Sequence, residues 1–152
     1  MKRFTKLSLL FFAVLLVFTS CDEEKYADWK VMNEIKYAND VATKTDYTLS
    51  ESGLCYKIIH QGETPKKVNI TSRVQVKYTG KLITGAVFDS RTEYLYVSET
   101  VLGWQEALTK LNVGGKIDFF LPAGLGYSEN KTGSIPPYST LYFSVEVLNA
   151  IN

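Results

Sequence analysis

The sequence predicts an α+β fold in which an antiparallel sheet covers one short helix. Four segments are rich in the β-branched and aromatic residues that favour strands, namely "LCYKII", "RVQVKYTGKLI", "KIDFFL" and "STLYFSVEVL". Between these strand segments, only "GWQEALTKL" has apolar residues at helical spacing, with Trp104, Leu108 and Leu111 on one face. Several strands with a single helix between them indicate an α+β architecture.

The last strand segment has the clearest pattern, because apolar and more polar residues alternate along it. Its apolar positions are Leu141, Phe143, Val145 and Val147. We therefore expect one face of this strand in the core and the other face nearer to solvent.

A further helix is predicted ahead of the sheet, from about Tyr26 to Ala42. Trp29 and Met32 fall on one side of it. The other side carries an apolar stripe whose members recur every three or four positions: Ala27, Val31, Ile35, Ala38 and Ala42. Three arrangements stay open, since the helix could pack on its own domain, pair with a second copy or act as a spacer from a membrane. The oligomeric state is therefore not predicted.

The first residues have the layout of a bacterial lipoprotein signal peptide. Three basic residues within the first six positions precede the apolar run 9–18, which is too short for a comfortable membrane span. Two small residues then lead into Cys21, the predicted lipidation site and first residue of the mature chain. The alternative is a plain signal peptide with an incidental cysteine. Either leader implies export, and lipidation implies anchoring to a bacterial membrane, in the periplasm or at the cell surface.

The chain is predicted to divide into three segments. Residues 1–20 form the signal peptide, residues 21–51 a helical segment with a polar linker, and residues 52–152 the main domain. With 152 residues, the chain has room for one globular domain and small appendages.

Composition excludes several functional classes. The formal net charge is +1 and no basic run occurs, which argues against nucleic-acid binding. His60 is the only histidine and has no carboxylate cluster beside it, so no metal site is predicted. No Ser-His or Cys-His nucleophile pair and no phosphate-binding glycine loop can be nominated. What remains is a set of aromatic residues around one charge.

These residues lie in four segments: "VKYTGKLITGAVFDSR", "VLGWQEALTKLNVGGK", "LPAGLGY" and "GSIPPYSTLYFSVEVL". In this order and spacing, the segments resemble the signature blocks of the FKBP-type peptidyl-prolyl cis-trans isomerases. The resemblance covers roughly residues 52–151. It implies a twisted antiparallel sheet wrapped around a short helix, in agreement with the α+β fold predicted above.

The resemblance also implies a set of site residues. Asp89 would stand beside the rotating carbonyl, Tyr127 would donate its phenol O–H to a substrate carbonyl, and Tyr78 would complete the catalytic group. The substrate-binding residues would be Phe88, Val101, Trp104, Ile135 and Phe143, with Trp104 as the floor, the Val101 N–H as a donor and Ile135 at the rim. A further family aromatic would be Tyr94 or Tyr96.

The implied reaction explains why ordinary acid–base groups are missing. Rotation about an X-Pro bond makes and breaks no covalent bond, so neither a nucleophile nor a cofactor is needed. The implied partners are proline-containing polypeptides, unfolded or newly exported, with macrolides as ligands of the same pocket. The main rival interpretation is a chaperone or binding module with little turnover. A third is a structural lipoprotein domain that uses the fold for assembly.

Overall fold

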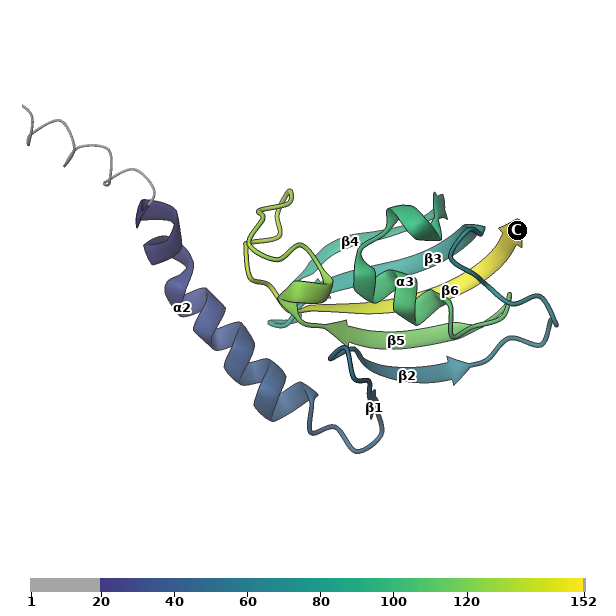
Figure 1. The fold of residues 1–152 in the computed structure, drawn as a ribbon, viewed down its shortest axis with the longest axis horizontal. Coiled ribbons are helices and arrows are strands. Elements are labelled where there is room, and N and C mark those ends of the chain that lie inside the picture. The colour runs from purple at the N-terminus through teal and green to yellow at the C-terminus, as the bar shows by residue number, and fades with distance from the viewer. Residues whose placement is uncertain (1–19, 152) are drawn as a thin grey trace, which may run out of the picture.

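The computed structural model describes residues 20–151, with only the backbone described for residues 20–23 (Figure 1). The predicted signal peptide therefore lies outside the described residues except for Ser20, and so does the side chain of Cys21. Within the described part, no helix is long and apolar enough to cross a bilayer.

Six antiparallel strands form a single sheet in the order β1-β2-β5-β6-β3-β4. The strands are β1 (Thr48–Leu49), β2 (Cys55–His60), β3 (Arg73–Leu82), β4 (Val87–Tyr96), β5 (Lys116–Leu121) and β6 (Leu141–Ile151). Helix α3 (Leu102–Leu108) lies across one face of this sheet (Figure 1). The predicted α+β architecture is confirmed.

The core lies between α3 and the facing side of the sheet. Alternate residues of β3, β5 and β6 point into it, which is the period expected of a strand with one buried face. From the helix, Trp104 and Leu108 are buried against them. Gly103 lets the helix approach closely, because a Cβ there would lie 2.9 Å from Leu121 Cδ2. This close packing fixes the place of Trp104 relative to the sheet.

The N-terminal helix, α2 (Ser20–Lys36), continues into one π-helical turn, η1 (Tyr37–Val41), and lies beside the sheet (Figure 1). It contacts its own domain through polar groups. Trp29 Nε1 donates to Ser139 Oγ at 3.1 Å, and Asn33 Oδ1 accepts from the Thr140 backbone N–H at 2.8 Å. Tyr37 also donates its hydroxyl proton to the carbonyl of Gly53. Of the three arrangements left open by the sequence, packing on the same chain is therefore observed.

Most of the predicted apolar stripe points away from this contact, although Ala42, just after η1, is half-buried. Val31 and Ile35 are 52% and 54% exposed, and Ala27 and Ala38 are exposed as well. The contacting face instead carries Asn33, which is 1% exposed.

Candidate active site

A pocket of about 260 Å³ opens between α3, β4 and the loop that precedes β6. Seven of the eight site residues predicted from the sequence line it: Tyr78, Phe88, Asp89, Val101, Trp104, Tyr127 and Phe143. They come from separate parts of the chain, so the fold brings them together. Ile135 does not line the pocket; it is 5% exposed and packs within the core.

The base of the pocket is a cluster of aromatic rings in edge-to-face contact, the arrangement that their charge distribution favours. Trp104 meets Tyr78 and Phe143, each at 5.1 Å between ring centroids and with interplanar angles of 90° and 83°. Phe88 meets Phe143 at 5.6 Å and 84°. Since Trp104 and Phe143 are only 5% and 4% exposed, the rings form a rigid, largely dry floor.

Gly80 makes room for these rings. It pairs with Asp89 on β4 and with Phe143 on β6, at the point where the pocket walls converge. A Cβ at this position would lie 2.6 Å from Phe88 Cζ and 2.8 Å from Phe143 Cε1. Any larger residue would therefore push the Phe88 and Phe143 rings away from their places in the pocket.

From Asp89 onward, every second residue of β4 forms one wall of the pocket, and Phe88 lines the pocket at the shift in register just before it. Asp89, Arg91, Glu93 and Leu95 all line it, because alternate side chains of a strand share a face. Residues 90, 92, 94 and 96 lie on the opposite face. Neither Tyr94 nor Tyr96, the two candidates for the further family aromatic, is therefore among the residues that line the pocket.

Both tyrosines are 47% exposed, and the Arg73 guanidinium lies 5.1 Å from the Tyr94 ring centroid and 5.9 Å from that of Tyr96. Leu95, which lies between them in the chain, lines the pocket.

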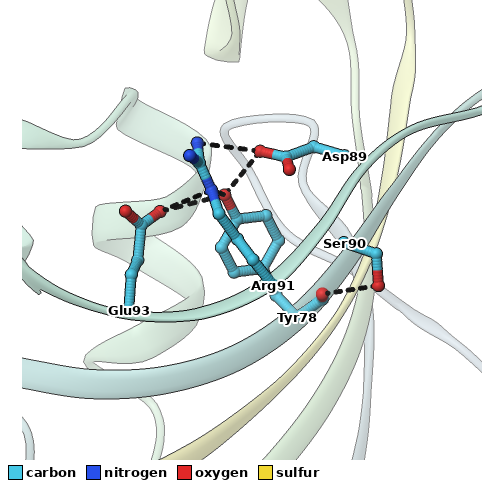
Figure 2. A network of polar contacts seen from close by, with 5 residues as sticks. All are labelled: Tyr78, Asp89, Ser90, Arg91 and Glu93. Atoms are coloured by element: carbon cyan, nitrogen blue, oxygen red, sulfur yellow. Dashed lines mark hydrogen bonds and ion pairs between the residues drawn. The ribbon is translucent and has the colours of Figure 1, made fainter.

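A network of polar contacts links Tyr78 to three charged residues of β4 (Figure 2). The Tyr78 hydroxyl donates to Asp89 Oδ2 at 2.6 Å and lies 3.0 Å from Glu93 Oε1, so its single proton serves one carboxylate at a time. Arg91 Nε donates to the same hydroxyl oxygen at 2.8 Å. Arg91 also pairs with Asp89 (Nη2 to Oδ2, 2.9 Å) and with Glu93 (Nε to Oε1, 3.2 Å).

This network fixes the protonation of Tyr78 and the direction of Asp89. Burial, and next the hydrogen bond donated to Asp89, raise the pKa of Tyr78 well above its ordinary value. The phenol therefore stays a neutral donor at physiological pH. On the other face of β4, Ser90 Oγ donates to the Tyr78 carbonyl oxygen at 3.4 Å (Figure 2). Asp89 is held by two donors, the Tyr78 hydroxyl and the Arg91 guanidinium, and its side chain is still 29% exposed at the pocket mouth.

Two further groups are available to a bound peptide. Among residues 20–151, neither the Val101 backbone N–H nor the Tyr127 hydroxyl makes a hydrogen bond. Val101 caps α3, where its carbonyl already accepts from the Trp104 and Gln105 amides. Both donors belong to residues that line the pocket, as the resemblance implied.

Sequence reasoning missed five lining residues: Arg91, Glu93, Leu95, Glu99 and Thr100. Counting in twos from Asp89 along a continuous strand would have found the first three. In the described part of the chain, no group of three or more potential metal ligands occurs.

A sequence model of the FKBP-type peptidyl-prolyl cis-trans isomerases matches residues 64–148, more than half of the chain. The chain belongs to this family. Among its relatives, the FKBP-type 22 kDa peptidyl-prolyl cis-trans isomerase of Escherichia coli K12 is 43% identical over 123 residues, covering 77% of this chain and 59% of the relative. The isomerase FkpA of Aeromonas hydrophila is 36% identical over 132 residues, covering 84% of this chain and 48% of the relative. The chain therefore spans about half the length of these relatives.

Solved structures agree on the fold of this FKBP-family chain. The crystal structure of FkpA from Escherichia coli superposes with a TM-score of 0.79 at 26% identity, covering 98% of this chain and 74% of that one. That of AtFKBP13 gives 0.61 at 28% identity, covering 69% and 98%. The fold is therefore FKBP-like, with an added N-terminal helix.

Proposed function

We propose that this protein catalyses cis-trans isomerisation of X-Pro bonds in polypeptides. One observation carries the proposal: a buried aromatic floor, Trp104 with Phe143, lines the same pocket as a carboxylate held in place by two donors. Family membership supports it, since the matching relatives are named as peptidyl-prolyl cis-trans isomerases.

Such a site suits a reaction in which only a torsion changes. An amide must lose its resonance to rotate, against a barrier of about 18–20 kcal/mol, and an unassisted X-Pro bond takes tens to hundreds of seconds. The planar amide is more charge-separated than the twisted one, so leaving water costs it more. A dry pocket therefore favours the twisted form, which is the condition for catalysis.

The polar groups act on the twisted form. Asp89 stands beside the rotating carbonyl, and its orientation is held by Tyr78 and Arg91. The Tyr127 hydroxyl and the Val101 N–H are free to donate to substrate carbonyls, which positions the peptide in the pocket. Trp104 supports the proline ring from below.

We further propose that the protein acts on newly exported polypeptides while anchored by a lipid on Cys21. The support is the leader: basic residues, a short apolar run, then small residues ahead of Cys21. Cys21→Ser should release the protein from the membrane or leave it unprocessed, because several acyl chains anchor stably where one does not. Mass spectrometry of the mature N-terminus decides the point. An unmodified terminus at another residue contradicts the anchoring.

The activity is tested by magnetisation-exchange NMR on a proline peptide, together with a refolding reaction limited by a proline isomerisation. The full mature chain is used, because β1 and the Tyr37 contact involve residues before position 52. Acceleration of both processes, blocked by a macrolide that fills the pocket, is expected. A protein that binds proline peptides without accelerating their exchange would instead be a binding module.

A further inference from the structure

The mouth of the pocket carries an excess of negative charge. Among its lining residues are three carboxylates, Asp89, Glu93 and Glu99, and a single cation, Arg91. This balance belongs to the site itself, since the whole chain has a net charge of only +1.

Arg91 cannot neutralise this excess. Its one positive charge is shared between Asp89 at 2.9 Å and Glu93 at 3.2 Å, which leaves the group with one net negative charge. Glu99, at the end of the 3-10 turn η2 (Val97–Glu99), is exposed and has no ion-pair partner among residues 20–151. Two net negative charges therefore face a bound peptide.

The position of these charges determines which residue of a bound peptide lies nearest to them. In the proposed reaction, the rotating carbonyl belongs to the residue before proline, and Asp89 stands beside that carbonyl. The residue before proline therefore lies toward the β4 wall, where Glu93 follows Asp89 on the same strand face.

We propose that the pocket prefers polypeptides with lysine or arginine immediately before the proline. This preference rests on the proposed isomerase function and names its substrate class. The attraction is electrostatic and partly exposed to solvent, so it is screened by salt.

The test uses blocked tetrapeptides that differ only in the residue before proline: lysine, Nε-acetyllysine or glutamate. Acetyllysine keeps the length of lysine and removes its charge. At low salt, kcat/KM for the lysine peptide should exceed that for the acetyllysine peptide about twofold to fivefold, since one exposed charge pair is worth up to about 1 kcal/mol. The glutamate peptide should be the poorest substrate, and high salt should bring the three values together.

Glu99→Lys should abolish or reverse the difference in kcat/KM between the lysine and glutamate peptides, and Glu99→Gln should make this difference smaller. Glu51→Gln is the matched control, because Glu51 is exposed and lies outside the pocket lining. Circular dichroism checks that each variant is folded. Rates of the acetyllysine peptide should stay within about twofold of wild type in Glu51→Gln.

The outcomes separate this preference from the proposed function. If the acetyllysine peptide is isomerised but the lysine peptide gains nothing at low salt, or if Glu99→Lys leaves the order unchanged, the charge preference is wrong and the isomerase stands. If no peptide is isomerised, the proposed function fails, and the affinities of the same peptides, measured by fluorescence anisotropy, still decide whether the mouth selects a cation.

Discussion

The pocket and the contact of helix α2 with its domain bury opposite kinds of side chain. In the pocket, apolar rings are buried and charged groups stand at the edge. At α2, the apolar residues Val31 and Ile35 are exposed, and the contact is made by Asn33, which is buried and hydrogen-bonded at both ends of its amide. Apolar periodicity thus identifies a helix without telling which face of it the protein covers.

The largest effect is expected from removing the pocket floor. Trp104→Ala should lower the free energy of unfolding by about 3–5 kcal/mol, because a buried indole leaves a cavity that the rings around it cannot close. Urea denaturation followed by circular dichroism measures this, with Trp104→Phe as the milder control. A loss below about 1 kcal/mol would mean that the floor is not part of the core.

Asp89→Leu tests whether the charged edge of the pocket contributes to turnover. Hydrogen bonds to charged groups are worth about 1.5–3 kcal/mol, so turnover should fall by more than about tenfold. Peptide affinity should change little if Asp89 acts on the twisted amide. Exchange NMR gives the rate, and Asp46→Asn serves as a control because Asp46 lies outside the pocket. An equal loss of rate and affinity would assign Asp89 to ground-state binding.

At the other attachment, Asn33→Ala should destabilise the docked helix. The Thr140 amide would lose the Asn33 side-chain oxygen that accepts its hydrogen bond, at a cost of about 1–3 kcal/mol. Faster hydrogen exchange at Thr140 and across α2 is the expected readout, with isomerisation unchanged. Asn39→Ala, at an exposed position of η1, is the control. Unaltered exchange at Thr140 would contradict a polar attachment.

Tyr127→Phe tests a single pocket donor. It removes one hydroxyl and little volume, and an uncharged hydrogen bond is worth about 0.5–1.5 kcal/mol, so the isomerisation rate should fall about threefold to tenfold. Near-ultraviolet circular dichroism should show an unchanged fold. A rate equal to that of the wild type would remove Tyr127 from the site.

The smallest effect is expected on the exposed stripe of α2. Val31→Ser and Ile35→Ser should each change the free energy of unfolding by less than about 0.5 kcal/mol, because both side chains face solvent and serine has a helix propensity close to theirs. Sedimentation should also be unchanged. A clear loss of stability, or dissociation of an oligomer, would mean that a second copy covers the stripe in solution.

The sequence alone determined the fold class and most of the candidate site. Alternation in β6 and helical spacing around Trp104 are local patterns, so they follow from residues close together in the chain. The family resemblance then supplied Asp89, Val101, Ile135 and the aromatic residues, and seven of these predicted positions line one pocket.

Only the tertiary structure decided what depends on pairing between distant segments. The register that pairs Tyr78 with Arg91 brings the Tyr78 hydroxyl to the charged face of β4, where it contacts Asp89 and Glu93. The packing of the loop before β6 buries Ile135 in the core, and it is not among the residues that line the pocket. The face of α2 that is buried depends on the Thr140 amide, more than 100 residues away, which needs an acceptor. No local pattern encodes these contacts, because each requires two parts of the chain to meet.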